Sequence, residues 1–506
     1  MKIAITGGSG HMGQAFLEEL NASFDTADSI TVLCHRDRIS KRSYPNIAHK
    51  LHFVFGDISN AEVCRKLIED CDVVFHICAL IPPASDSHPQ AAISCNERGT
   101  KLLIKAMEGA KKQPALVDVS TVALYGNRTG SHSYGRVGDP LLPSPFDIYA
   151  ITKLRAEYAV LQSKVEKWVV LRQTALFHPD FLSDNLHDGL MFHTCFDAPL
   201  EWVTAKDSGR LLLHLLQGMK SGELAEDFWK KVYNIGGGSG MRMYGYQTYE
   251  QGLNIIGGGV RDFFKPHYNA TRNFHGMWFS DSDDLNSILN FRTQSAEDYW
   301  QEFYRQHPLY RCGRALPKGL IGLFAIKRLL NTPNSPYYWA KNGDVARLTA
   351  YFGGRKAYDA LQKRGWEDFP LPENIPDFVP MKREERILAY GYDIEKDDAL
   401  ITADDIKTVA EAHGGKCLTV ERFCGDMYEN LLWRTAGGRE FWATAFTVLR
   451  AGHWYNAAYE QNLWEFDALA KTDSILARIW YDSHDRGENN LYFFDENFKA
   501  HIKTSD

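Results

Sequence analysis

Short apolar runs alternate with longer amphipathic segments over residues 1–180 of the chain. Runs rich in Val, Ile, Leu and Phe predict strands that are buried on both faces. The segments between them predict helices that carry the chain from one strand to the next parallel one, so we expect a doubly wound α/β sheet. The predicted strands are Ile3–Thr6, Ile30–Cys34, Leu51–Phe55, Val73–His76, Leu116–Ser120 and Trp168–Leu171, and the predicted helices are Met12–Leu20, Ala61–Glu69, Thr100–Ala110 and Ile148–Gln162.

The pattern becomes less regular after residue 180. Residues 181–310 contain a predicted strand pair, Glu201–Val203 and Val232–Ile235, among glycine-rich turns and aromatic helices. A helical stretch over 317–366 leads into 368–380, where four prolines exclude both a helix and a central strand. We therefore predict three parts: residues 1–310, with a smaller mixed substrate region mainly at 181–310; a helical extension and linker at 311–380; and a separate C-terminal α+β module at 381–506.

Composition and charge narrow the class of protein. The 506 residues are 44% hydrophobic and 24% charged, which is typical of globular chains. The net charge of −7 argues against nucleic acid as a partner, and no apolar stretch reaches the roughly 18 residues of a membrane span. Nine cysteines without a CxxC pair indicate reduced thiols and a cytoplasmic location. We expect a protein that acts on a small molecule, with neither a membrane nor a nucleic acid as its partner.

A glycine-rich turn stands between the first strand and the first helix, with the sequence Thr6-Gly-Gly-Ser-Gly-His-Met-Gly13. Gly7 allows a tight turn, Gly10 lets the backbone approach a pyrophosphate, and Gly13 allows close packing of the helix. The helix start, His11 and Met12, offers free N–H groups to phosphates. In this context the pattern predicts a dinucleotide site in a Rossmann domain.

The end of the second strand bears on the choice of cofactor. An acidic residue usually binds the ribose of NAD there, but this chain has His35 followed by Arg36. A guanidinium suits a 2′-phosphate, so we favour NADP and keep NAD as possible; Asp37 could reach the ribose instead. Asp57, with Ile58 beside it, follows the third strand and could meet the adenine edge.

Tyr149 and Lys153 lie four residues apart and therefore share one face of a predicted helix. A nearby ammonium and a positively charged nicotinamide ring would stabilise the phenolate, so the phenol could exchange protons near neutral pH. Ser120 and Thr121 end an earlier strand, where their hydroxyls could bind a substrate oxygen. Together with the glycine turn, these residues predict carbonyl and alcohol chemistry.

These motifs resemble those of the extended short-chain dehydrogenase/reductases, also called the NAD-dependent epimerase/dehydratase family. The resemblance covers residues 1–310, through TGGSGHMG, GDIS, HICA at 76–79, NERGT at 96–100, STVALYG, YAITK, WVTAKD and YNIGG. It implies that Tyr149 is the acid/base, that Lys153 holds the nicotinamide ribose and lowers the pKa of the tyrosine, and that Thr121 orients the substrate, with Ser120 less favoured. It also implies that Ala79 and Asn96 line the cofactor channel, and that a homodimer formed through helices is possible.

The family carries several reactions. We favour an NAD(P)-dependent oxidoreductase that interconverts a carbonyl and an alcohol. The alternatives are a sugar epimerase that retains its cofactor and a non-catalytic cofactor-sensing or scaffold protein. Sugar dehydratases carry an Asp-Glu pair where this chain has Val122-Ala123, so dehydration lacks an evident acid.

Several residues near the predicted site are left without a firm role. The loop 81–89, rich in proline, is expected to overhang the nicotinamide. Few basic residues converge on the substrate side, which argues against a nucleotide-sugar diphosphate as the substrate. Three histidines are expected to have surface or structural roles, namely His178, His187 and His193. Four aromatic residues are expected to pack in a core and not to line a pocket, namely Phe274, Trp278, Phe279 and Tyr299.

A second resemblance lies in the C-terminal module, where residues 409–460 look like a small zinc ribbon. The positions that match its metal ligands are Thr435, Arg439, Tyr455 and Ala458, which cannot form a tetrahedral N/S site. We therefore expect no metal, with only a weak alternative at Cys417, Cys424 and His453. A docking or dimerisation role, or a cap over the active site, is the expected use of this module.

Overall fold

Seven parallel strands form the central sheet of the protein. The computed structural model describes residues 1–35, 39–128, 130–185, 187–369, 371 and 383–504. Every neighbouring pair in the sheet is parallel, so the predicted doubly wound α/β fold is confirmed. Across the sheet the order is β11 (Lys231–Ile235), β7 (Trp168–Gln173), β5 (Ala115–Thr121), β4 (Val73–His76), β1 (Lys2–Thr6), β2 (Ser29–Cys34) and β3 (Leu51–Phe55).

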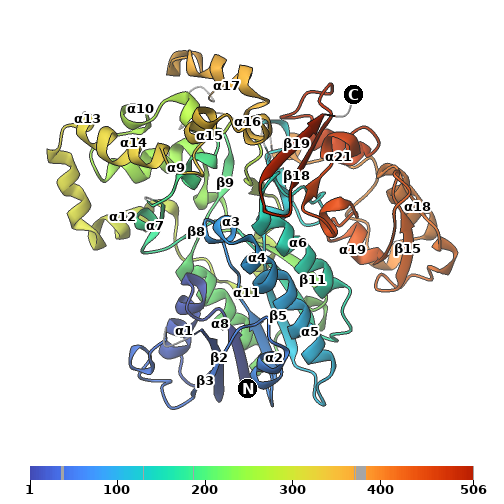
Figure 1. Cartoon of the computed structure of the whole chain (residues 1–506). Coiled ribbons are helices and arrows are strands. Elements are labelled where there is room, and N and C mark those ends of the chain that lie inside the picture. The colour runs from blue at the N-terminus through green and yellow to red at the C-terminus, as the bar shows by residue number, and fades with distance from the viewer. Residues whose placement is uncertain (36–38, 129, 186, 370, 372–382, 505–506) are drawn as a thin grey trace.

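Helices cover both faces of this sheet, because its strands are apolar on both sides. The direction of winding reverses between β1 and β4, and ligands of such sheets bind at the carboxyl ends of the strands near that point. In Figure 1 the N-terminus lies at the bottom, so those carboxyl ends point upward. One face carries α1 (His11–Ala22), α8 (Ala205–Ser221) and α11 (Ser282–Leu289), and the other carries α2 (Ala61–Leu67), α5 (Thr100–Glu108) and α6 (Ile148–Leu161).

The substrate region is built from short elements, and its strands pair differently from the prediction. Val232–Ile235 joins the central sheet beside β7, and Glu201 belongs to a separate strand, so the two segments do not pair with each other. The short pairs are β9 (Pro199–Glu201) with β12 (Arg242–Tyr244), β10 (Val203–Thr204) with β8 (Leu176–Phe177), and β13 (Trp278–Phe279) with β6 (Tyr134–Gly135). Its helices are α7 (Phe181–Asn185), α9 (Gly245–Asn254), α10 (Val260–Phe263) and α12 (Ala296–Gln306).

Two later parts of the chain gather above the carboxyl ends of the sheet and beside α6 (Figure 1). The first is the predicted helical extension, with α13 (Lys318–Ile321), α14 (Lys327–Leu330), α15 (Pro336–Asn342), α16 (Val345–Phe352) and α17 (Arg355–Gln362). The second holds the antiparallel sheets β14 (Lys416–Cys417), β15 (Asn430–Arg434), β16 (Glu440–Thr444) and β17 (Leu463–Trp464), β18 (Asn490–Phe494), β19 (Ala500–Thr504). Its helices are α18 (Ala403–Ala412), α19 (Ala445–Leu449), α20 (Phe466–Leu469) and α21 (Ser474–Trp480).

The hydrophobic clusters continue from the Rossmann sheet into both later parts. One cluster joins Tyr125 and Ile151 to Trp339 and Trp464, and another joins Val160 to Trp433. The three-part division therefore stays a prediction, and most of the predicted linker lies outside the described residues.

Helix α6 is buried along almost its whole length because the C-terminal residues cover its outer side. Glu157, fully buried, accepts from Arg172 Nη2 at 2.6 Å and from the hydroxyl of Ser120. His453 Nε2 lies 3.0 Å from the same carboxylate, and Arg172 donates to the backbone oxygen of Ala451 at 2.7 Å. This buried network fixes the C-terminal residues to the helix that also carries Tyr149 and Lys153.

The residues that look like zinc-ribbon ligands serve other purposes. Thr435 Oγ1 accepts from the backbone N–H of Arg439 at 3.2 Å, across the turn between β15 and β16. His453 is held between Glu157 and Tyr459, whose hydroxyl lies 2.7 Å from its Nδ1. None of the comparisons described below supports a zinc-ribbon module.

Candidate active site

The glycine turn has the tight geometry that the sequence predicts. Gly7 has φ +76°, and a Cβ on it would lie 2.7 Å from the backbone nitrogen of Cys78. A Cβ on Gly13 would come within 2.2 Å of the backbone oxygen of Gly7. Gly10 is different, because a Cβ there would meet only the Gly7 oxygen, at 3.5 Å. Gly7 and Gly13 thus serve close packing, while Gly10 leaves its backbone open just before α1, which starts with His11 and Met12.

The residues predicted for the adenosine end lie at the ends of β2 and β3. His35 is exposed after β2, and Arg36 lies outside the described residues. Asp57 is exposed, and its Oδ1 accepts from the backbone N–H of Ser59 at 2.8 Å. Ile58 is buried beneath it. Their contacts with a cofactor stay a prediction.

Asn96 holds the loop that follows β4. Its amide accepts from Leu80 N at 2.7 Å and donates to Leu80 O at 3.1 Å. It also donates to Thr152 Oγ1 at 3.0 Å, which ties this loop to α6. Ala79 lies immediately before Leu80, so Asn96 fixes the backbone that the sequence predicts to line the cofactor channel.

Tyr149 and Thr121 meet where β5 ends and α6 begins. Asp147 caps α6, since its Oδ1 accepts from Ala150 N at 2.8 Å, and this places Tyr149 in the first turn. Burial raises the pKa of Tyr149 to about 12, while a hydrogen bond with Thr121 lowers it. Lys153, one turn further on, is buried and donates from Nζ to Val119 O at 2.9 Å.

The structure separates the two hydroxyls that the sequence places together. Successive side chains of a strand point to opposite faces. Thr121 accordingly bonds Tyr149, whereas Ser120 bonds Glu157 inside the buried network. Thr121 is therefore the hydroxyl beside the phenol, and Ser120 Oγ donates to Glu157.

A cavity of about 370 Å³ opens beside Tyr149. The glycine turn reaches it through His11, and the loop after β4 through Pro82 and Asp86. Other walls come from far along the sequence: Arg347 and Tyr351 of α16, and Phe494 and Phe498 of the β18–β19 hairpin. Phe494 and Phe498 of the C-terminal part thus form a section of the cavity wall, and a cap role for the whole module stays a prediction.

Two of the three histidines expected to have surface or structural roles, His178 and His193, line the cavity. His178 follows β8, and its ring stacks on that of His11 with centroids 3.6 Å apart. Burial, followed by the neighbouring His11, lowers the pKa of His178 to about 4, so its imidazole is neutral. His193 donates from Nε2 to the backbone oxygen of Asn334 at 2.7 Å. Of the four aromatic residues, Phe274 lines the cavity, and the other three lie in cores.

Asp86 was missed by sequence reasoning. Burial and then the charge of Asp147 raise its pKa to about 7, although Arg347 opposes this. The loop 81–89 contributes Ile81, Pro82, Asp86 and Pro89 to the cavity. The sequence signal was present, because an acid in a loop that follows a central strand lies at the carboxyl edge of the sheet.

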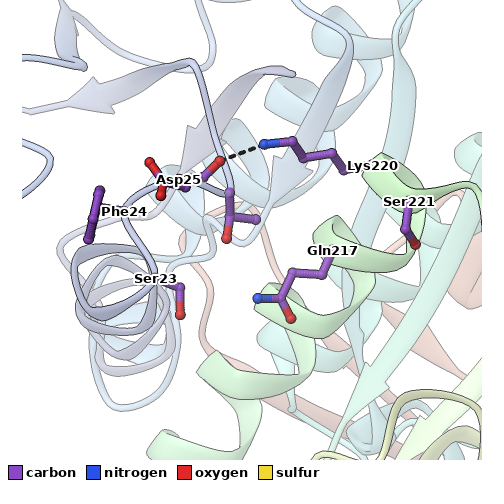
Figure 2. Close-up of a pocket in the computed structure, with 7 residues that line it drawn as sticks. Ser23, Phe24, Asp25, Gln217, Lys220 and Ser221 are labelled. Atoms are coloured by element: carbon purple, nitrogen blue, oxygen red, sulfur yellow. Dashed lines mark hydrogen bonds between the residues drawn. The ribbon is translucent and has the colours of Figure 1, made fainter.

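A wider hollow of about 500 Å³ lies elsewhere, between the ends of α1 and α8 (Figure 2). Lys220 Nζ donates there to the backbone oxygen of Asp25 at 2.5 Å. The hollow precedes β2 in the chain and so lies at the amino ends of the strands, away from Tyr149. It is not a candidate for the predicted chemistry.

Parts of the chain are similar to known proteins. Residues 3–236 match the NAD dependent epimerase/dehydratase family. A 3-beta-hydroxysteroid dehydrogenase of Mycolicibacterium neoaurum is 29% identical over 33% of this chain and 44% of its own length. A UDP-glucose 4-epimerase of Mycoplasma genitalium is 29% identical over 26% of this chain and 39% of its own. The crystal structure of the dTDP-glucose 4,6-dehydratase DesIV of Streptomyces venezuelae, with NAD and TYD bound, gives a TM-score of 0.48 at 21% identity, covering 62% of this chain and all of that one.

The family match covers residues 3–236, which is less than half of the chain. The chain spans about half the length of the curated relatives or less, so their particular reactions do not transfer. Among the described residues, no helix combines the length and apolar character that a membrane crossing needs. The homodimer and the cytoplasmic location stay predictions.

Proposed function

We propose that the protein is an NAD(P)-dependent oxidoreductase that interconverts a carbonyl and an alcohol by hydride transfer, with Tyr149 as acid and base. The observation that carries this proposal is that Tyr149, which is hydrogen-bonded to Thr121, lines one cavity together with His11, the first residue of α1. That cavity lies at the carboxyl edge of a doubly wound sheet, where such folds bind their ligands.

The residues around the glycine turn fit a dinucleotide. The open side of Gly10 allows a pyrophosphate to approach the backbone, and a Cβ would take up that space. The first N–H groups of α1 have no partner within the helix and point toward the turn. A bound nicotinamide would supply or accept the hydride.

Each catalytic side chain has a distinct task in this proposal. Tyr149 exchanges a proton with the substrate oxygen, and Thr121 hydrogen-bonds the same oxygen and the phenol. With a pKa of about 12, the phenol needs positive charge nearby to work near neutral pH. Lys153 lies one turn away on the same helix, and its ammonium supplies part of that charge.

We also infer a preference for NADP, which rests on Arg36 in the sequence. Arg36→Ala should lower the ratio of kcat/KM for NADPH over NADH by about tenfold, since a charged hydrogen bond contributes roughly 1.5–3 kcal/mol. A native enzyme that prefers NADH would remove the role given to Arg36.

The central test compares two tyrosines of one helix. Tyr149→Phe should lower kcat by about 10²–10⁴-fold, the usual contribution of a positioned acid/base. Tyr158→Phe is the matched control, because its hydroxyl bonds Trp442 O at 2.5 Å and does not line the cavity. Turnover is followed with a panel of carbonyl compounds through the absorbance of reduced nicotinamide. Equal activity of both variants would exclude Tyr149 as the acid/base.

The same measurements separate the alternatives. An epimerase would be indicated by two results together: mass spectrometry finds NAD that co-purifies with the protein, and turnover leaves the nicotinamide absorbance unchanged. Biological activity that survives Tyr149→Phe would indicate a cofactor-sensing or scaffold protein.

A further inference from the structure

The walls of the catalytic cavity are mainly apolar. Aromatic and aliphatic side chains contribute most of them, including Phe146, Leu176, Phe181, Phe274, Phe494 and Phe498. A cavity with such walls and a few polar groups at the reacting end binds molecules that are themselves largely apolar.

The charges around the cavity argue against a strongly anionic substrate. Among the described residues that line it, Asp86 and Asp147 are acidic, and Arg347 carries the guanidinium. That guanidinium is bonded to Asp344 at 2.7 Å, so its charge is already balanced. A diphosphate placed here would face the Asp147 carboxylate and, as it loses its proton, Asp86, and it would gain little from Arg347.

A second cavity of about 730 Å³ lies next to the catalytic one. It is formed between the α15–α16 helices and the β18–β19 hairpin, and its lining mixes apolar with charged side chains. Val345, Ala500 and Ile502 are among the first, and Asp188, Asp344 and Lys499 among the second. The two cavities share the same wall residues, namely Asp86, Asn334, Arg347 and Phe498. They are therefore neighbouring compartments, with these four side chains at their boundary.

We propose that the substrate is an uncharged, elongated ketone or alcohol that is apolar around its reacting carbon. Its oxygen-bearing carbon lies at Tyr149, and its tail extends past Phe498 and Arg347 into the second cavity. The catalytic cavity, at about 370 Å³, is near the small end of ligand pockets, roughly 300–1,000 Å³, so a longer molecule needs the second compartment. This inference rests on the proposed function and names the substrate class of the same site.

The test uses a homologous series of methyl ketones, from butanone to methyl tridecyl ketone, with the holoenzyme. Both kcat/KM and the calorimetric Kd are measured along the series. Each added methylene should improve both by up to about fourfold until the second cavity is filled, since burying a CH₂ contributes about 0.8 kcal/mol.

A variant that fills only the second cavity locates the tail. Val345 lines that cavity and not the catalytic one, and it is 59% exposed, so Val345→Trp should fold. We expect this variant to weaken the binding of the long ketones by about tenfold or more and to leave the binding of butanone unchanged. Ile288→Trp is the matched control, because Ile288 is 47% exposed and lines neither cavity.

The outcomes separate this inference from the proposed function. Turnover of ketones without any dependence on chain length overturns the inference and leaves the function standing. Length-dependent binding without turnover overturns the function and leaves the inference standing. A nucleoside-diphosphate sugar with a higher kcat/KM than every ketone, or equal effects of the two tryptophan variants, also overturns the inference.

Discussion

Replacing Glu157 by glutamine tests the buried network that joins α6 to the C-terminal residues. The change keeps the shape of the side chain but removes the charge that balances Arg172. Both side chains are fully buried, so the guanidinium would lose its counter-charge in a medium where water cannot replace it. Breaking one partner of a buried pair costs about 3–5 kcal/mol of unfolding free energy.

The pH dependence provides a second signature of the same network. Burial by itself would raise the pKa of Glu157, but Arg172 and His453 outweigh it and hold the pKa well below its usual range. A lowered pKa stabilises the folded state above the ordinary value of 4.5, and this stability is lost as the pH falls further. The advantage of the native chain over Glu157→Gln should therefore be full at neutral pH and shrink under acid conditions.

The assay is urea unfolding followed by tryptophan fluorescence, at neutral pH and at several acid pH values. Glu226→Gln is the control, since it breaks the Lys167–Glu226 pair of 2.7 Å, in which Glu226 is 81% exposed. An exposed pair of this kind contributes at most about 1 kcal/mol. If the two variants lose the same unfolding free energy, the network does not fix the C-terminal residues to α6 in the way we describe.

Two further predictions concern the cofactor turn and the cavity. Gly13→Ala places a methyl group against the Gly7 oxygen and should cost about 1–3 kcal/mol of unfolding free energy by overpacking. Gly10→Ala should keep the stability and weaken dinucleotide binding about tenfold or more. Urea denaturation measures the first effect, and titration with the cofactor measures the second. Asp86 has a raised pKa of about 7, so the folded native chain holds a proton that the unfolded chain has lost, and its stability should fall as the pH rises from about 4 to about 7. Asp86→Asn should reduce this loss of unfolding free energy by up to a few kcal/mol. If the native chain and the variant show the same dependence of unfolding free energy on pH, the raised pKa of Asp86 is contradicted.

The central sheet could be predicted closely because parallel strands buried on both faces are continuous apolar runs. Leu51–Phe55 and Val73–His76 have the predicted bounds, and the other strands of the first part differ by one or two residues. The partner of a strand is harder to predict. An apolar run such as Val232–Ile235 is equally compatible with the edge of a large sheet and with a short two-stranded sheet. The burial of α6 on nearly all sides had no sequence signal, because Ala458 and His453, which cover Arg155 and Glu157, lie about three hundred residues further along the chain.

The candidate site was predicted where local motifs carry it. Tyr149, Thr121 and the glycine turn come together because strand ends and helix starts meet at one edge of the sheet. Phe494 and Phe498 could not be predicted, since their position depends on how the last hairpin packs. His178 and Asp86 could have been found, because both follow central or neighbouring strands at their carboxyl ends.

The cover over α6 also limits how two copies of this protein could associate. Arg155 donates to Ala458 O at 2.8 Å, and Tyr158 and Gln162 bond Trp442 and Thr447, so the outer flank of that helix is already occupied by its own chain. A symmetric pairing across this flank would require the last hundred residues to move away. A homodimer that leaves these intrachain hydrogen bonds intact would have to form through another surface of the molecule.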